Sequence, residues 1–135
     1  MITAVDSSVL FDVFQLNSEF GDVSALALQR CREEGRTVIC GIVLAELAAG
    51  FPSKAALEER LRDLDIDYLP LCDDAAYLAG AKWKAYRARG GSRQRLIADF
   101  LIAAHALVQC DRLLTRDRGF CRLCFAELPI VEPTS

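Results

Sequence analysis

Two carboxylates of this 135-residue sequence lie in apolar surroundings, where an isolated charge is costly. Asp99 interrupts the run "RLIADFLIAAHALVQCDRLLTRD", residues 95–117, in which nearly every position from Leu96 to Val108 is apolar. Glu46 is the only ionisable residue in "IVLAELAAG", and we expect both side chains to be largely buried. A buried carboxylate must be paired with a cation, protonated or bound to a metal. Neither the apolar stretch from Leu96 to Val108 nor "IVLAELAAG" contains Lys or Arg, so the alternative to a metal is a cation from elsewhere in the chain.

Two further acids follow short apolar runs that are typical of β-strands. Asp6 comes directly after "ITAV", and Asp117 comes just after "LLT". In an open parallel sheet, ligands bind beyond the carboxyl ends of the strands, so both acids are candidate site residues. Each also has a purely structural interpretation, because Asp6 could cap a turn that starts at Ser7 and Asp117 could cap a short helix through Phe120.

The four acids can converge on one pocket if the helices that carry Glu46 and Asp99 enter the sheet edge where Asp6 and Asp117 lie. Clustered carboxylates repel one another unless a divalent cation lies between them, and oxygen ligands without His or Cys favour Mg²⁺ or Mn²⁺. Such a site suits the hydrolysis of phosphodiesters. A phosphatase or response-regulator receiver that uses Asp6 is disfavoured, because it needs a second acid two residues later, where Ser8 stands.

The elements that position these acids are short strands alternating with helices. The predicted strands, each apolar enough to be covered on both faces, are Ile2 to Val5, Thr37 to Cys40, Ile66 to Leu69, Arg112 to Thr115 and Pro129 to Val131. The predicted helices are Phe20 to Glu34, Ile42 to Ala49, Ser53 to Asp65 with Ser53 as N-cap, Asp73 to Arg89 and Arg93 to Gln109. This alternation predicts an α/β fold, a three-layer α/β/α sandwich with a central parallel sheet of about four or five strands, in one domain over residues 1–135.

Four segments of the sequence, read in order, resemble the acidic motifs of the PIN-domain ribonucleases. They are "AVDSSVLFDVF", "VLAELAAG", "IADFLIAAHAL" and "LLTRDRGF", and they are most similar to the motifs of the VapC-type toxins of bacterial toxin–antitoxin pairs. The resemblance spans essentially the whole chain. It implies that the metal-binding and catalytic acids are Asp6, Glu46, Asp99 and Asp117, with Ser8 and Thr115 in supporting positions. Ser8 stands where family members often have Asn, which leaves the hydrogen bond of that side chain in question.

The resemblance implies a Mg²⁺- or Mn²⁺-dependent endoribonuclease that cleaves single-stranded or structured RNA. It also implies a homodimer, and inhibition by an antitoxin whose tail occupies the active site. The alternatives are a housekeeping PIN-domain RNA-processing nuclease and a non-catalytic PIN-fold protein that binds RNA or serves as a scaffold. The intact set of four acids favours an enzyme, because a non-catalytic relative has no physical reason to keep carboxylates that repel one another.

One basic segment is a candidate RNA-binding surface, although the whole chain has a net charge of −3. The segment "KWKAYRARGGSRQR", residues 82–95, contains six basic residues and no acid, with Trp83 and Tyr86 interleaved. The residues predicted to contact RNA phosphate are Arg87, Arg89, Arg93 and Arg95. The alternative is a solvated helix face followed by a flexible Gly90–Gly91 turn.

Three residues near the predicted site have alternative interpretations. Arg116 and Arg118 flank Asp117 and are candidates to contact phosphate, the alternative being ordinary surface residues. Asp12, six residues beyond Asp6, is interpreted as a solvated residue on a turn more readily than as part of the site.

The composition excludes several other classes of protein. A hydrophobic content of 53% predicts a globular chain. No charge-free apolar run is long enough to span a membrane, and the N-terminus lacks the features of a signal peptide, so we expect a cytoplasmic protein without membrane association. The six cysteines are expected to be small buried hydrophobes, and the one CxxC, Cys121 and Cys124, lacks the further ligands of a structural zinc site because His105 is the only histidine.

Overall fold

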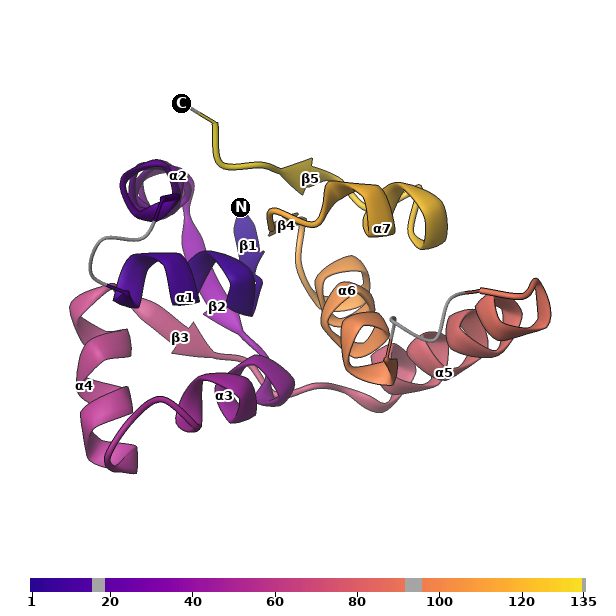
Figure 1. The fold of residues 1–135 in the computed structure, drawn as a ribbon, viewed down its shortest axis with the longest axis horizontal. Helices are drawn as coiled ribbons and strands as arrows, with labels where there is room; N and C mark the ends of the chain where they lie inside the picture. The colour runs from indigo at the N-terminus through magenta and orange to yellow at the C-terminus, as the bar shows by residue number, and fades with distance from the viewer. Residues whose placement is uncertain (16–18, 92–95, 135) are drawn as a thin grey trace.

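The computed structural model describes residues 1–15, 19–91 and 96–134. Its centre is one parallel sheet (Figure 1). The strands are β1 (Ile2–Val5), β2 (Arg36–Ile39), β3 (Ile66–Tyr68), β4 (Arg112–Leu114) and β5 (Ile130–Val131), paired in the order β3-β2-β1-β4-β5. The predicted parallel sheet is confirmed, and each strand lies within one or two residues of its predicted position.

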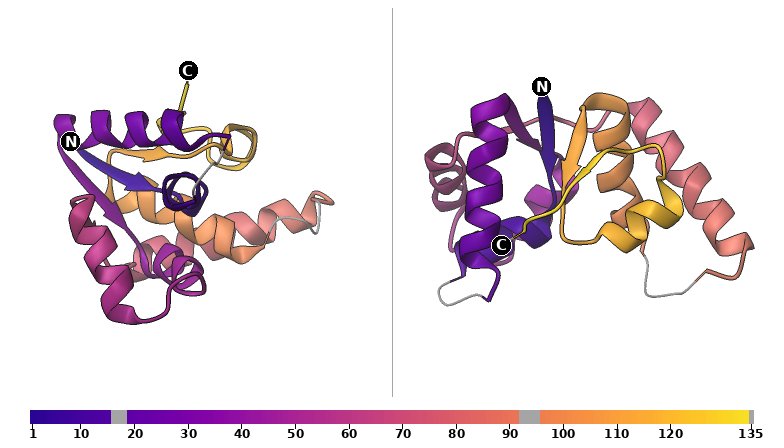
Figure 2. Two further views of the ribbon diagram at one scale, coloured as in Figure 1. Left: turned by 60° about the vertical axis from the view of Figure 1, so that its left-hand side comes forward. Right: turned by 90° about the horizontal axis from the view of Figure 1, so that it is seen from above.

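Helices cover both faces of this sheet, which confirms the three-layer α/β/α prediction (Figure 2). They are α1 (Ser7–Phe14), α2 (Gly21–Glu34), α3 (Gly41–Ala48), α4 (Lys54–Asp63), α5 (Asp73–Ala88), α6 (Ile97–Gln109) and α7 (Arg118–Cys124). Helix α2 packs on one face, while α6 packs on the other against β1 and β4, with α5 alongside it. Within the described ranges, no helix combines the length and the apolar character needed to cross a membrane.

The structure differs from the sequence prediction in three elements. Residues 7–14 form the helix α1 where only a turn was expected, because Val9 and Leu10 are buried and the helix packs on α2 and α3. Helix α6 begins at Ile97 and not at Arg93, and residues 93–95 lie outside the described part of the chain. Two residues of β3, Asp67 and Tyr68, are exposed, so the expected cover on both faces is wrong for this edge strand.

All six cysteines were expected to be buried, and this prediction is confirmed for four of them. Cys31, Cys40, Cys121 and Cys124 are buried among the aliphatic and aromatic side chains of both helix layers. The other two cysteines, at positions 72 and 110, are half-buried.

The only histidine makes folding stability sensitive to acid. His105 is buried in α6, and its Nε2–H donates to the carbonyl of Leu69 at 2.9 Å. Burial lowers the pKa of the imidazole, against a smaller opposite effect of that hydrogen bond. The folded protein therefore keeps His105 neutral at a pH where the unfolded chain, with an ordinary pKa of about 6.5, already takes up a proton.

We expect the contribution of His105 to the free energy of unfolding to be fully present above about pH 6.5. It should fall as the pH drops from there toward the folded-state pKa of His105. His105→Gln keeps an N–H donor but does not titrate, so it should lose less stability than the parent between about pH 7 and pH 5. Urea unfolding at both pH values measures this, and equal losses in the two proteins would contradict it.

Candidate active site

The candidate site lies at the carboxyl edge of the sheet, between β1 and β4. The strand order runs from β1 outward to β2 and β3, and then continues on the other side with β4 and β5. This reversal is the topological switch point at which open α/β sheets bind ligands. Val5 and Leu114 are register partners, and the N–H of Asp6 donates to the carbonyl of Leu114 at 2.9 Å. Asp6 and Thr115, which follow these two strands, therefore lie side by side.

One hydroxyl joins Asp6 to Asp117. Thr115 is 1% exposed, and its Oγ1 donates to Oδ2 of Asp6 at 2.7 Å and accepts the backbone N–H of Asp117 at 3.0 Å. Ser8 Oγ donates to the same oxygen of Asp6 at 2.8 Å, so this serine makes the hydrogen bond that was in question. Asp6 occupies the N-cap position of α1, but its side chain makes no capping hydrogen bond, so the capping interpretation of that carboxylate is wrong.

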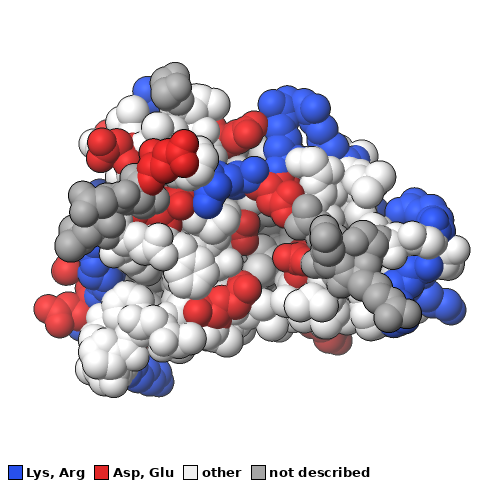
Figure 3. Space-filling model, in the orientation of Figure 1, with Lys and Arg blue, Asp and Glu red and all other residues white. Residues whose placement is uncertain are grey.

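Asp99 and Asp117 line the same small pocket as Asp6. Asp117 Oδ1 accepts the N–H of Phe120 at 3.4 Å, so this acid does cap α7, as one interpretation held. Asp99 lies in the first turn of α6, where its Oδ2 accepts the N–H of Leu96 at 3.2 Å, and it is half-buried rather than largely buried. The pocket is lined by Asp6, Asp99, Ile102, Ala103, Leu113, Thr115, Asp117, Phe120 and Cys121. On the face drawn in Figure 3, acidic side chains border a hollow in the middle of the molecule.

Glu46 lies beside this group on α3, which begins directly after β2 at the same edge of the sheet. Ser7 Oγ donates to its Oε1 at 3.0 Å. The residue is exposed, so the expected burial is wrong: Val43 and Leu47 form the buried face of α3, and Glu46 lies to one side of that face. The pKa of its carboxyl is nevertheless raised, first by partial loss of hydration and then by the negative charges of Asp6 and Asp99, while the bond from Ser7 lowers it. The charges of Asp6 and Asp99 thus act on Glu46.

Ser7 is a further candidate site residue, which the sequence alone did not single out. Its side chain is buried at the start of α1 and bridges the β1 edge to Glu46. The signal for it was the pair of serines directly after Asp6, of which only Ser8 was singled out.

Asp12 is not the solvated residue that we expected. It is 5% exposed within α1, and it forms a two-point ion pair with Arg116, from Nε to Oδ2 at 2.6 Å and from Nη2 to Oδ1 at 3.1 Å. Ser24 Oγ also donates to Oδ2, at 2.8 Å. The error came from missing α1, because a turn would have left Asp12 in solvent.

The basic segment falls only partly within the described residues. Arg87 and Arg89 are exposed at the C-terminal end of α5, and the guanidinium of Arg87 lies over the ring of Trp83 at 5.1 Å. Arg93 and Arg95 lie outside the described residues. In Figure 3, basic side chains gather at the right-hand end of the molecule, where Figure 1 places the end of α5.

The ligand atoms of the site are of the chemical type that a hard divalent cation prefers. Among residues 1–15, 19–91 and 96–134, no three His, Cys, Asp or Glu side chains are placed so that they could hold a metal ion without rearrangement. All four acids offer carboxylate oxygens, the ligands that Mg²⁺ and Mn²⁺ prefer. The pocket has a volume of about 20 Å³, room for roughly one water-sized species. The pKa of Glu46 is raised first by partial burial and then by the charges of Asp6 and Asp99, and a bound cation would relieve this second effect.

Comparison with known proteins places this site in context. The sequence model of the PIN domain matches residues 3–126, whereas curated protein sequences yield no match. One chain with the same fold comes from the crystal structure of VapBC2 from Rickettsia felis bound to a fragment of promoter DNA. It aligns with a TM-score of 0.77 and 20% identity over 98% of both chains. VapBC-1 from nontypeable Haemophilus influenzae aligns with a TM-score of 0.71 and 20% identity over 100% of both chains. DNA-bound VapBC from Salmonella typhimurium aligns with a TM-score of 0.71 and 20% identity over 99% of both chains.

Proposed function

The chain belongs to the PIN domain family, and on this basis we propose that it is a Mg²⁺- or Mn²⁺-dependent endoribonuclease that acts as the toxin of a toxin–antitoxin pair. The observation that carries the proposal is the convergence of Asp6, Asp99 and Asp117 on one pocket at the topological switch point. These acids come from three separate regions of the chain. Folding alone would gain nothing from bringing like charges together, so their convergence favours a cation-binding role.

In the proposed mechanism, the residues of this chain hold and orient the reacting groups. Asp6, Asp99, Asp117 and Glu46 are the residues that would hold the ion. The chemistry that such an ion supplies, when bound, is activation of a water molecule and neutralisation of charge on the attacked phosphodiester. Thr115 and Ser8 fix the carboxylate of Asp6 through two hydroxyl donors. Ser7 does the same for Glu46, so the orientation of two acids is set before substrate binds.

The proposed partners follow from the similar structures. The three similar structures described above are VapBC proteins, which supports a cognate antitoxin as partner of this chain. We also propose that the protein is a homodimer in the cytoplasm, as the resemblance to the VapC-type toxins implies. RNA is the proposed substrate.

The proposal is tested by incubating the pure protein with a labelled total RNA in Mg²⁺, in Mn²⁺ and in EDTA. We expect internal cleavage with either metal and none in EDTA, because the phosphodiester cannot be cleaved without the charge neutralisation that the ion supplies. Undiminished cleavage in EDTA would contradict the proposed metal dependence. Absence of cleavage in any condition, together with tight RNA binding, would favour the non-catalytic alternative.

A growth experiment separates the toxin from a housekeeping nuclease. Induced expression of the parent in a bacterial host should arrest growth, while Asp6→Asn should not. If a small open reading frame lies beside the gene and encodes the antitoxin, its co-expression should restore growth. Normal growth with an active nuclease would instead assign the chain to RNA processing.

RNA binding should depend on the exposed arginines of α5. Replacing Arg87 and Arg89 together by Gln should weaken binding of a single-stranded RNA and reduce the slope of log K against log salt by about 1.4, since each phosphate contact on a single strand contributes roughly 0.7. Metal affinity should be unchanged. Fluorescence anisotropy over a salt series measures both the affinity and the slope.

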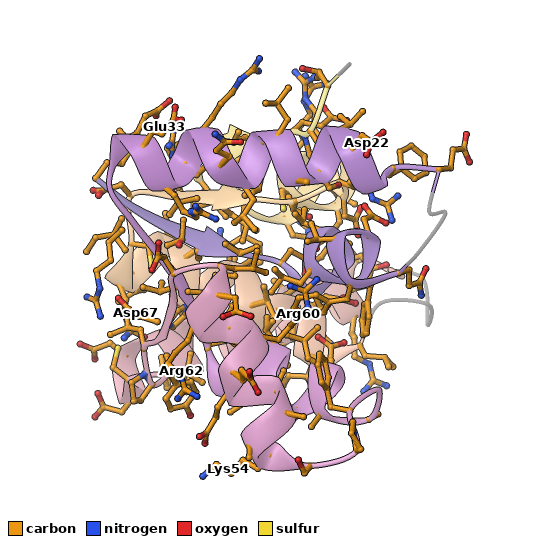
Figure 4. The ribbon with its side chains drawn as sticks, turned by 90° about the vertical axis from the view of Figure 1, so that its left-hand side faces the viewer. Asp22, Glu33, Lys54, Arg60, Arg62 and Asp67 are labelled. Carbon is orange, nitrogen blue, oxygen red and sulfur yellow. The ribbon has the colours of Figure 1, made fainter. Side chains whose placement is uncertain are left out.

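A matched control removes two positive charges from another helix. Lys54 and Arg62 are exposed on α4, on the side of the molecule shown in Figure 4. Changing both to Gln alters the net charge by the same amount and should leave the salt slope near that of the parent. Equal effects of the two pairs would show that only net charge matters, and would assign Arg87 and Arg89 to a solvated face.

A further inference from the structure

Helix α7 contributes side chains to two hollows of different character. Asp117, Phe120 and Cys121 line the acidic pocket. Arg118 and Arg122 line a second, wider hollow of about 480 Å³, together with residues of the C-terminal segment that contains β5. Because residues four apart lie on the same face of a helix, the two arginines share one face of α7. This helix therefore carries an acid of the candidate site on one face and two cations on the neighbouring face.

Both arginines are accessible to a large anionic ligand. Arg122 is exposed in the last turn of α7, and the side chain of Arg118 is 51% exposed. Arg118 Nη1 donates to Oε2 of Glu132 at 3.3 Å, but Glu132 is itself 37% exposed. Ion pairs of this kind contribute at most about 1 kcal/mol, so a phosphate can displace the carboxylate. In Figure 3, basic side chains gather above the acidic hollow, where Figure 1 places α7 and β5.

The acidic pocket is too small to hold a nucleotide. Its volume of about 20 Å³ gives room for roughly one water-sized species. An attacked phosphodiester would therefore lie at the rim of this pocket, with the flanking nucleotides on the surface beyond it. Helix α7 forms part of the rim, because Asp117 lines the pocket and Arg118 follows it directly. The second hollow is within the size range of ligand sites, and its lining includes the apolar side chains of Leu128 and Ile130.

We propose that Arg118 and Arg122 form a second RNA-binding surface, which contacts backbone phosphates of the nucleotides that flank the cleaved bond. The inference rests on the proposed function, since it takes RNA as the substrate. A guanidinium suits this role because it stays charged and binds phosphate through two N–H donors. Two such groups one helical turn apart can contact neighbouring phosphates of one strand. This surface is separate from Arg87 and Arg89, which lie at the end of α5.

The alternative for both arginines is a structural role. A cation at position 122, in the last turn of α7, interacts favourably with the helix dipole. Arg118 joins α7 to Glu132, which directly follows β5. A purely structural pair would affect the free energy of unfolding and leave the affinity for RNA unchanged.

The first test replaces both arginines by Gln and measures binding of a labelled single-stranded oligoribonucleotide in EDTA. We expect binding to weaken about tenfold or more at 0.1 M salt, and the slope of log K against log salt to fall by about 1.4, since each phosphate contact contributes roughly 0.7. The control, Lys54→Gln with Arg62→Gln, removes the same charge from α4, where Lys54 also has a glutamate partner, Glu58. An unchanged slope, or equal changes in the two double variants, would overturn the proposal.

Removal of Glu132 tests the surface in the opposite direction. Glu132→Gln frees Arg118 and removes a negative charge from the hollow, so RNA should bind about threefold tighter or more at low salt. Asp67→Asn is the matched control, because Asp67 is an exposed acid that pairs with Arg36 at 2.9 Å and lies on β3, at the other edge of the sheet. If Glu132→Gln binds RNA no tighter than Asp67→Asn does, the hollow is not an RNA site.

Cleavage kinetics separate failure of this inference from failure of the proposed function. Replacing Arg118 and Arg122 by Gln should raise KM and leave kcat within about threefold, because contacts to flanking phosphates hold substrate and transition state equally. A lower kcat with unchanged KM would assign the effect to the neighbouring Asp117 and contradict the proposal. If the parent binds RNA but cleaves none with Mg²⁺ or Mn²⁺, the proposed nuclease fails, and the salt slope still decides the role of the arginines. If the parent binds no RNA, the inference itself is wrong.

Discussion

Asp99→Asn is expected to lower RNA cleavage by at least about a hundredfold while leaving the metal-free protein folded. A neutral amide is a poorer ligand for a hard divalent ion, and the charge stabilisation that such an ion supplies is worth several kcal/mol in the transition state. Asp99 also lies in the first turn of α6, where a negative charge interacts favourably with the helix dipole. Its removal takes away one of the nearby negative charges that, after the larger effect of burial, raise the pKa of Glu46. These two effects oppose each other, so the unfolding free energy in EDTA should change by less than about 1 kcal/mol.

Thermal unfolding in EDTA and in Mn²⁺ separates a ligand from a structural acid at position 99. The parent should gain about 2.7 kcal/mol from Mn²⁺ at a hundred times its dissociation constant, whereas Asp99→Asn should gain much less at the same concentration. An aspartate paired with a buried cation would behave differently, because substitution would leave that cation uncompensated at a cost of roughly 3 to 5 kcal/mol. Such a loss in EDTA, with cleavage retained by the folded fraction, would show that Asp99 is structural.

Thr115→Val is expected to cost both stability and activity, although its side chain is nearly the same shape. The substitution removes the donor to Asp6 and the acceptor of the half-buried backbone N–H of Asp117. Loss of a hydrogen bond to a charged group, together with an unsatisfied N–H, should lower the unfolding free energy by about 2 to 4 kcal/mol. Because the hydroxyl orients two of the four acids, cleavage should also fall by about a hundredfold.

Thr115→Ser is the matched control, since it keeps the hydroxyl and removes only a methyl group. It should retain cleavage within about tenfold of the parent and lose about 1 kcal/mol of stability from the small cavity. Urea unfolding and cleavage rates at saturating Mn²⁺ measure both variants. If Val and Ser reduce cleavage equally, the methyl packing of Thr115 matters and its hydroxyl does not orient the acids.

The alternation of strand and helix was readable from the sequence because local periodicity and capping determine it. The five strands were located to within two residues, and Ser53 caps α4 as expected, with its Oγ accepting the N–H of Ala56 at 3.1 Å. Helix α1 was missed because "SSVLFDVF" is short and rich in residues with low helix propensity, so its packing against α2 and α3 decides its conformation.

The sequence by itself determined which residue types stand after the strands and inside the apolar helices, and therefore that the candidate site consists of oxygen ligands. Only the tertiary structure decided which of these groups meet. The strand order places β1 beside β4, and the register of Val5 with Leu114 brings Asp6 to Thr115 across more than a hundred residues of chain. The tertiary structure also leaves Glu46 exposed and buries Asp12 against Arg116. Burial and ion pairing depend on contacts between segments that are distant in the chain, and local sequence patterns do not encode these contacts.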